Sequence, residues 1–228
     1  MGRDYLLWFP YRISETDIGG SALKRLCSCL LLVAVLLGPA TAFAQQRTIY
    51  NTPYPRTIRV AIREARPNGD PNPRGRIIYV KSVSFDDYVV NSLPNEWVPS
   101  WNQEALQAGA MAVKMFAWYK TLNPTKLDGW EFDLDNTTNF QTYREGNRFK
   151  ESDEAYWRTR NLAYTMPNGE IVELNYRAGI EKNPNWQYRN ANMMAQWGSQ
   201  YWADRGQNML QILQWYFQGR AMHRIPNL

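Results

Sequence analysis

The sequence predicts an α+β fold, in which a single domain of mixed strands and packed helices follows an N-terminal targeting segment. Two stretches near the start of the domain, residues 57–63 and 76–83, have strand patterns. A long helical pattern begins at residue 101, and two more helices are predicted at residues 193–204 and 208–217. Strands come first and helices later, with a hairpin between them, which is typical of an α+β domain.

Residues 1–45 have the pattern of a signal peptide or an N-terminal anchor. Lys24 and Arg25 precede an apolar run at residues 26–37, and the Ala-Phe-Ala stretch at 42–44 has the small-x-small pattern of a cleavage site. The apolar run is shorter than the roughly 20 residues that a membrane-spanning helix needs. We therefore expect export, with membrane contact only through residues 26–37 if the segment is not cleaved.

Cysteine usage and charge narrow the location further. Both cysteines, Cys27 and Cys29, lie in the targeting segment, so the mature chain would have no thiol and no disulfide. The formal net charge of the whole chain is +5, which suits a polyanionic cell-wall surface. No dense stripe of Lys and Arg is present, so no nucleic-acid partner is expected. These features predict a bacterial protein of the cell envelope or the extracellular space.

Residues 46–57 are polar, contain prolines and are interpreted as a linker, which places the domain at residues 58–225. In the first strand, Ile58, Val60 and Ile62 alternate with polar residues, as in a half-buried strand. A turn-rich insert at residues 65–74 separates it from the second strand.

The long helix has the clearest signals at both ends. Ser100 and Gln103 fit the N-cap and N3 positions of a capping box, and Asn123-Pro124 ends the helix. Its apolar residues recur at the spacing of one buried face, and many are alanines, which allow close packing. They are Ala105, Ala108, Ala112, Met115 and Tyr119.

Later elements are predicted from shorter signals. Ser152 is expected to cap a short helix that ends at Arg160. A hairpin is predicted from two strand-like runs, residues 163–166 and 170–176, on either side of Pro-Asn-Gly at 167–169. Gly206 is a plausible C-cap residue between the last two helices.

Glu96 is the strongest candidate for a catalytic group. It lies in Leu-Pro-Asn-Glu-Trp-Val-Pro at 93–99, where two prolines and Trp97 make a rigid and partly apolar setting. Apolar surroundings raise the pKa of a glutamate, as a general acid near neutral pH requires. The alternative is a loop carboxylate that only caps the following helix near its positive end.

Several motifs occur in an order that points to one family. They are V-S-F-D-D-Y-V at 83–89, L-P-N-E-W-V-P-S-W at 93–101, E-A-L-Q-A-G-A-M-A-V-K at 104–114, N-T-T-N-F-Q-T-Y at 136–143, M-A-Q-W-G-S at 194–199 and I-L-Q-W-Y-F at 212–217. Together these motifs resemble stage II sporulation protein D and its relatives, the LytB amidase-enhancer family. No single motif would be specific.

The resemblance implies a peptidoglycan lytic transglycosylase, which cleaves the MurNAc–GlcNAc bond without water as the MurNAc 6-hydroxyl closes on C1. The catalytic glutamate of the family falls on Glu96. Since the attack is intramolecular, one carboxylate can act first as acid and then as base, whereas an ordinary glycosidase needs two. Asp133 and Asp135 are possible electrostatic helpers, and Glu104 has no role in the family.

Candidate substrate-binding residues come from the same motifs and from the aromatic excess, since apolar sugar faces pack on indole and phenol rings. They are Trp97, Lys114, Gln141, Tyr143, Tyr176, Gln196 and Trp197. Each also has a structural interpretation. Gln141 and Tyr143 would then satisfy a buried turn, and Gln196 and Trp197 would pack in the core.

Lys114 carries a more specific expectation. It shares a helical stripe with Gln103, Gln107 and Ala110, beside the buried face, and should reach back toward Glu96. We expect Lys114 to line the same cleft and to contact the glycan. The alternative is an exposed lysine at the edge of its helix.

Two departures from the family pattern lie in this helix. Where this chain has Lys114 and Gly109, the family has Arg and Gln. A third concerns metal binding. Some members bind zinc through Cys and His near the fourth motif, where this chain has Asn139 and Phe140. With no mature Cys and only His223 as imidazole, we expect no metal and no cofactor.

Two functions therefore stand after the sequence analysis. The first is an exported lytic transglycosylase acting on peptidoglycan glycan strands. The second is a non-catalytic glycan-binding module that enhances a cell-wall amidase as its partner. Glu96 favours the first, and the altered positions, Lys114 among them, favour the second.

Overall fold

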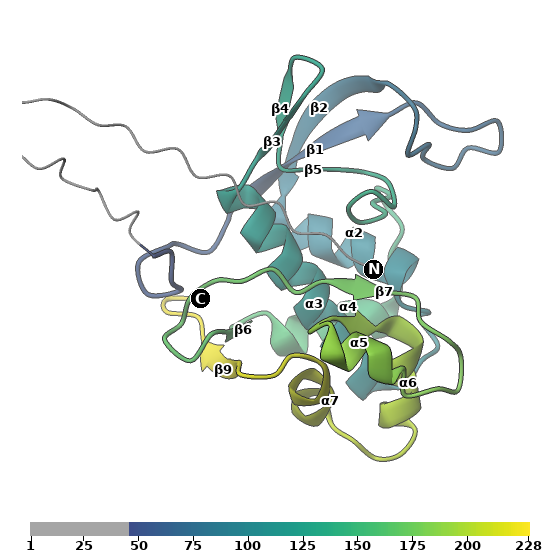
Figure 1. The fold of residues 1–228 in the computed structure, drawn as a ribbon. Coiled ribbons are helices and arrows are strands. Elements are labelled where there is room, and N and C mark those ends of the chain that lie inside the picture. Colours follow the sequence, from purple (N-terminus) through teal and green to yellow (C-terminus); the bar gives the residue numbers. More distant parts are fainter. Residues whose placement is uncertain (1–45) are drawn as a thin grey trace, which may run out of the picture. The chain divides into compact units, whose positions relative to one another are not determined.

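A computed structural model of the chain describes residues 46–228, so the predicted signal segment at 1–45 lies outside the described residues. The described part is a mixed α+β domain, as predicted (Figure 1). Its helices are α2 (Phe85–Glu96), α3 (Gln103–Leu122), α4 (Lys150–Thr159), α5 (Trp186–Asn190), α6 (Gln196–Ala203) and α7 (Met209–Tyr216). Its strands are β1 (Thr57–Arg63), β2 (Ile77–Ser84), β3 (Thr125–Leu127), β4 (Trp130–Phe132), β5 (Leu134–Asp135), β6 (Leu162–Thr165), β7 (Tyr176–Arg177), β8 (Met194–Ala195) and β9 (Ala221–Arg224).

Strand β1 is the middle strand of a three-stranded sheet. It pairs with β2 in antiparallel fashion and with β5 in parallel. Ile58 and Val60 are fully buried, as their alternation predicts. The first predicted strand is confirmed at residues 57–63, and the second begins one residue later than expected.

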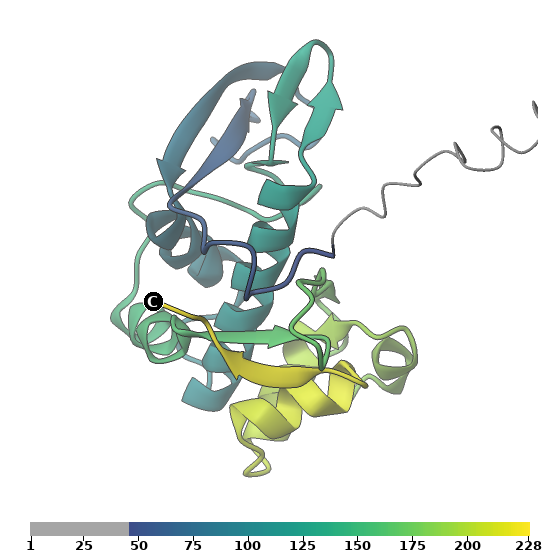
Figure 2. The ribbon, with the colours of Figure 1, turned by 90° about the vertical axis from the view of Figure 1, so that its left-hand side faces the viewer.

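Helix α3 is the centre of the domain. It contacts α2, α4, α6, α7, β1 and β6, and thirteen of its residues are buried. Figure 2 shows the three-stranded sheet and the β3–β4 hairpin at one end of α3, and the C-terminal elements at the other. The burial is wider than the one face expected from the sequence, because alanines on several sides let neighbouring elements approach closely.

Helix α2 was not expected, since Pro94 and Pro99 suggested a loop around Glu96. Ser84 caps it by accepting a hydrogen bond from the Asp87 N–H, and Asp86 and Asp87 occupy its first turn, where acidic side chains are favourable. Pro94 lies in its last turn, where the helix ends two residues later. Glu96 is therefore the last residue of a helix.

Other local expectations were wrong in their details. Asn102, not Ser100, caps α3, with its side chain accepting from the Glu104 N–H. Ser152 is inside α4 and does not cap it. Only a tight turn at residues 166–170 remains of the predicted hairpin, because β6 pairs with the C-terminal strand β9, 56 residues or more further along the chain. The last two helices are confirmed in shorter form, and Asn208 and Gln211 form the capping box of α7.

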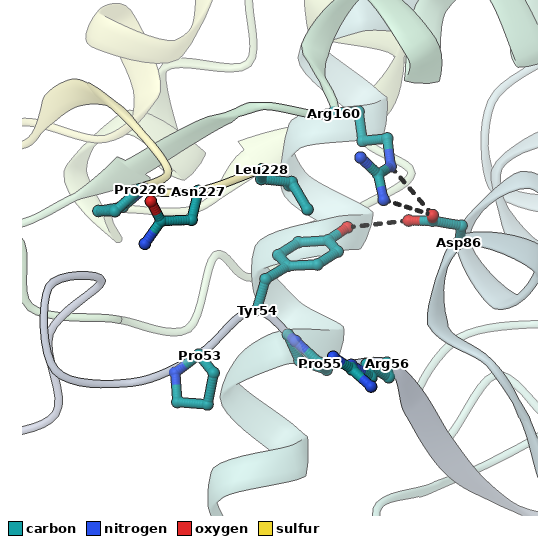
Figure 3. Close-up of a pocket in the computed structure, with 9 residues that line it drawn as sticks. All are labelled: Pro53, Tyr54, Pro55, Arg56, Asp86, Arg160, Pro226, Asn227 and Leu228. Carbon is teal, nitrogen blue, oxygen red and sulfur yellow. Dashed lines mark hydrogen bonds and ion pairs between the residues drawn. The ribbon is translucent and has the colours of Figure 1, made fainter.

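Residues 46–57 are not a free linker but pack on the domain. Ile49 is buried in the core, and the Tyr54 ring makes edge contacts with Phe85 and Trp118. The Tyr54 hydroxyl donates to Asp86, which also receives the Arg160 guanidinium (Figure 3). Tyr54, Asp86 and Arg160 line a pocket of about 490 Å³, in which Asp86 and Arg160 form an ion pair. The linker prediction from the polar composition of residues 46–57 was wrong, because a few buried apolar side chains are enough to order a short segment.

Within residues 46–228, no helix is both long and apolar enough to cross a membrane.

Replacing Tyr54 with Ala should show that the segment is part of the folded unit. Loss of the contacts with Phe85 and Trp118 should lower the free energy of unfolding by about 2–4 kcal/mol. Urea unfolding of the mature chain measures this. Tyr50→Ala is the matched control, because Tyr50 lies in the same segment but is 61% exposed, and it should change stability much less. Equal, small effects would restore the linker interpretation.

Candidate functional site

Glu96 lies where three separate segments meet. Its Oε1 accepts a hydrogen bond of 2.6 Å from the Thr142 N–H, and its Oε2 accepts one of 3.2 Å from Gln196 Nε2. Gln196 Nε2 also donates to the Glu96 carbonyl oxygen at 2.6 Å. The end of α2, the 137–143 loop and the start of α6 are thus joined through one half-buried residue.

Opposing effects set the pKa of Glu96. Burial raises it, while the hydrogen bonds from Thr142 and Gln196 and the positive charge of Arg177 lower it. The net direction is upward, so desolvation outweighs the donors. The sequence predicted this direction from the proline-flanked, apolar setting, although not the helix or the donors.

Trp97 positions Glu96 and offers no face to a ligand. Its side chain is fully buried, and Nε1 donates to Ser199 Oγ at 3.0 Å. A Cβ on Gly109 would lie 2.5 Å from the indole, so the ring rests directly on the α3 backbone. The predicted substrate contact of Trp97 is therefore wrong, and the glycine at 109 has a steric reason in this chain.

Gln141 and Tyr143 belong to a packed network. Gln141 is fully buried, accepts from the Tyr88 hydroxyl at 2.9 Å and donates to the Val113 carbonyl at 3.3 Å. The Tyr143 ring stacks on Tyr88 with 5.3 Å between centroids, and only 4% of Tyr143 is exposed. Gln141 therefore holds the turn that presents the Thr142 N–H. Tyr143 keeps an edge on a small pocket of about 220 Å³.

Strand β7 brings two more residues to Glu96. Burial and the nearby Glu96 charge raise the pKa of Tyr176 well above its usual value, so its hydroxyl keeps its proton. That hydroxyl is buried and has no hydrogen-bond partner among residues 46–228. Arg177 is exposed, and within the same residues it makes no ion pair. The exposed Arg177 cation is therefore available to a ligand that reaches Glu96, whereas the Tyr176 hydroxyl is enclosed by the protein.

Helix α6 begins with the two remaining candidates. Gln196 holds Glu96, as described, and is 9% exposed. Trp197 points elsewhere: it is half-buried, and its ring lies 4.6 Å from that of Trp101. The structure therefore brings Glu96, Tyr176 and Gln196 together and places Trp197 on an adjoining surface.

Three other acidic residues that the sequence analysis considered, Glu104, Asp133 and Asp135, have structural partners. Glu104 Oε2 accepts the Met209 N–H at 2.6 Å, at the start of α7. Asp133 and Asp135 receive guanidinium groups of β1, from Arg59 at 2.8 Å and Arg63 at 2.6 Å. None of the three carboxylates is free to act as a second catalytic acid.

The residues at the family's zinc positions do not fit a metal. Asn139 Nδ2 donates to the Pro73 carbonyl at 2.9 Å and to Asp135 at 3.2 Å, and Phe140 packs on Phe132. Within residues 46–228, no cluster of three or more His, Cys, Asp or Glu could hold an ion.

Lys114 corrects the sequence analysis most clearly. It is fully buried and faces α4, where Nζ donates to the carbonyls of Thr159 and Leu162 at 2.5 Å and of Arg160 at 3.2 Å. Burial lowers its pKa to about 7, helped by the charge of Arg160 and opposed by Asp86. Three carbonyls match the three N–H groups of an ammonium, which favours the charged form. Lys114 therefore caps α4 and does not line a cleft with Glu96.

Sequence reasoning missed Thr142, Tyr88, Trp101 and Arg177. Thr142 acts through its backbone N–H, which no side-chain pattern reveals. Tyr88 and Trp101 lie within the motifs, and Arg177 directly follows the candidate Tyr176, so their positions, although not their roles, were visible.

Comparisons with known proteins match part of the chain to a family model and to a relative. Residues 73–173 match the family model of SpoIID, the stage II sporulation protein. An uncharacterized protein of Brachyspira hyodysenteriae is 41% identical over 104 residues. That alignment covers 45% of this chain and 27% of the relative, so the chain spans about a quarter of its length.

The raised pKa of Glu96 predicts a pH-dependent stability. The folded state binds the Glu96 proton more tightly than the unfolded chain, in which the pKa is near 4.5. The resulting stabilisation is complete below that pH and is lost as pH rises through the folded pKa. The melting temperature of the wild type minus that of Glu96→Gln should therefore fall as the pH rises above about 4.5.

Glu131→Gln is the matched control of opposite sign. Hydrogen bonding from Arg59 lowers the pKa of Glu131, so its stabilisation is present above the unfolded pKa and is lost as the solution is acidified. A pH-independent difference for Glu96→Gln would show that the carboxyl is not desolvated.

Lys114→Met should lower the free energy of unfolding by about 1–3 kcal/mol, because the three carbonyls of the α4 end lose their donor. Lys114→Arg should retain more stability, since a guanidinium keeps the charge and several donors. Lys126→Met is the matched control, because Lys126 is 79% exposed at its side chain and should change stability by less than about 0.5 kcal/mol. If the Lys114→Met variant bound glycan more weakly and its stability were unchanged, Lys114 would be a substrate-binding residue after all.

Proposed function

The chain belongs to the SpoIID family, and from that premise we propose that it is an exported peptidoglycan lytic transglycosylase with Glu96 as acid and base. A SpoIID domain is consistent with a role at the cell wall. The cleaved bond would be that between MurNAc and GlcNAc in glycan strands of the bacterial envelope.

The observation that carries the proposal is the environment of Glu96. Its carboxyl is half-buried, has a raised pKa and is fixed by donors from the 137–143 loop and α6. A general acid must hold its proton near the working pH and release it into the transition state, which a raised pKa permits. Glu104, Asp133 and Asp135 are engaged with structural partners, so a mechanism with one carboxylate fits this chain better than one with two.

The reaction would use Glu96 twice. The protonated carboxyl first donates to the glycosidic oxygen as the bond to C1 breaks. The resulting carboxylate then accepts the proton of the MurNAc 6-hydroxyl, whose oxygen bonds to C1 and closes the anhydro ring. The Thr142 N–H and the Gln196 amide would stabilise the ionised carboxylate between these steps. Arg177, which is exposed and whose charge acts on Glu96, would orient the sugar beside it.

One observation favours a non-catalytic alternative. The same contacts join three segments of the chain through Glu96, as a carboxylate with a purely structural role would. In that case the protein would bind glycan strands and enhance a cell-wall amidase, its partner, without cleaving a glycosidic bond.

Glu96→Gln separates the two functions. The mature protein is incubated with glycan strands freed of stem peptides, and anhydro-MurNAc ends are measured by mass spectrometry. The wild type should form them, and Glu96→Gln should lower the rate by about 10²–10⁴-fold, the contribution of general acid catalysis. Glu104→Gln is the matched control, because Glu104 caps α7 and has no place in the reaction, so its rate should stay near that of the wild type.

Wild-type activity in Glu96→Gln would remove Glu96 from the chemistry. A wild type that binds strands and accelerates an amidase, but forms no anhydro ends, would establish the alternative.

A further inference from the structure

A surface hollow beside the candidate site has the chemistry of a sugar-binding subsite. Its volume is about 340 Å³, within the range of about 300–1,000 Å³ that is common for small-ligand pockets. We call it the Trp101–Trp197 pocket. Its lining consists of Trp101, Glu181, Lys182, Trp197, Gln200, Tyr201, Asp204 and Arg205.

The two tryptophans provide apolar faces. Their ring centroids are 4.6 Å apart with 52° between the planes, and both side chains are half-buried, so each keeps part of its ring open to the pocket. Aromatic rings of this kind combine a large rigid contact area with low conformational freedom. The Arg205 guanidinium lies 3.5 Å from the centre of the Tyr201 ring, which fixes a third aromatic residue in the wall.

Polar groups that suit sugar hydroxyls surround these rings. Gln200 is held at both ends, since Oε1 accepts from the Asn102 N–H at 2.9 Å and Nε2 donates to Asp204 Oδ1 at 2.8 Å. Asp204 itself is exposed, so its carboxylate can accept from a ligand. Glu181 and Lys182 add an acceptor and a donor at the rim, and both are well exposed.

The loop that carries Glu181 and Lys182 is built in advance of any ligand. Buried Asn185 accepts from the Ile180 N–H at 2.8 Å and donates to the carbonyls of Ile180 at 3.0 Å and Asn183 at 2.6 Å. Both Lys182 and Asn185 adopt positive φ angles, 54° and 59°. Such conformations persist where side-chain contacts impose them, and here the Asn185 amide does so.

The pocket is built on the same short segments of the chain as the Glu96 site. Gln196 and Trp197 are consecutive residues of α6, and the first holds Glu96 while the second lines the pocket. Trp101 follows Glu96 across a tight turn closed by the Trp101 N–H and the Val98 carbonyl at 2.9 Å. These two chain connections place the pocket near Glu96, as binding of one polymer to both would require.

We propose that the Trp101–Trp197 pocket binds an N-acetylated hexosamine unit of the same glycan strand, away from the bond that Glu96 acts on. This proposal rests on the proposed function, because it takes the glycan as the ligand. The apolar face of the sugar stacks on the indoles, and its hydroxyls reach Asp204 and the rim. The pocket thereby sets the length of strand that binds well.

The test uses N-acetylglucosamine oligosaccharides of increasing length, titrated into the mature Glu96→Gln protein by calorimetry. Trp197→Leu keeps apolar packing but removes the aromatic face, and it should weaken binding of the longer oligosaccharides by about 3–10-fold, equivalent to about 0.7–1.4 kcal/mol. Trp186→Leu is the matched control, since Trp186 is 55% exposed on α5 and lines no part of the pocket, so its affinity should be unchanged.

A second measurement does not depend on the variant folding. In NMR spectra of the wild-type protein, the indole N–H signals of Trp101 and Trp197 should shift when oligosaccharide is added, and the signal of Trp186 should not. Unchanged affinity in Trp197→Leu, or indole signals that do not move, would overturn the proposal.

The two proposals fail in different ways. If no anhydro ends form but affinity depends on Trp197, the transglycosylase proposal fails and the pocket stands. If Glu96-dependent cleavage occurs and Trp197→Leu binds and cleaves long strands like the wild type, the pocket proposal fails alone.

Discussion

The burial of α3 on nearly every side is the constraint on which the domain depends. A helix in that position needs small side chains where neighbours approach, and any polar group on it must find its partners inside the protein. Its alanines admit α2, α4, α6 and α7, and Gly109 admits a whole indole ring against the backbone. Lys114, fully buried on the same helix, donates hydrogen bonds to the carbonyls at the end of α4. One helix therefore determines where α2 ends, where α4 ends and where α6 lies.

The position of Glu96 follows from that packing. Trp97 is held between Gly109 and Tyr176, with 4.8 Å between the aromatic centroids, and so the end of α2 is fixed against α3. Thr142 and Gln196 then meet the carboxylate from two other segments. Burial and the hydrogen bonds act on its pKa in opposite directions, and burial prevails. A sugar that covered this half-buried carboxyl would remove more water and raise the pKa further, so that binding itself would favour the protonated acid.

Sequence patterns predicted the features that depend on local order. The alternation of β1, the position of α3 and the raised pKa of Glu96 each follow from residues close together in the chain. What the patterns missed depends on distant partners. The 166–170 turn does not close a hairpin because β9 pairs with β6 instead. Lys114 lies on a stripe that looks exposed in isolation, and only the end of α4, more than 40 residues away, explains its burial. Residues 46–57 are polar, yet Ile49 and Tyr54 anchor them.

The pKa and the pairing of Glu96 help to distinguish a catalytic carboxylate from a purely structural one. A carboxylate with only a structural role stabilises a fold best when it is fully paired, as Asp135 is with Arg63, the Thr137 N–H and the Thr137 hydroxyl. Glu96 has donors of the same kind, but its nearest cation, Arg177, forms no ion pair within residues 46–228, and burial raises its pKa above the usual value. At neutral pH this arrangement costs folding free energy that a paired carboxylate would not. Groups held in an unfavourable state by rigid surroundings are characteristic of catalytic sites. Here the desolvation that destabilises the ionised carboxylate keeps the carboxyl protonated, so that it has a proton to donate to the substrate.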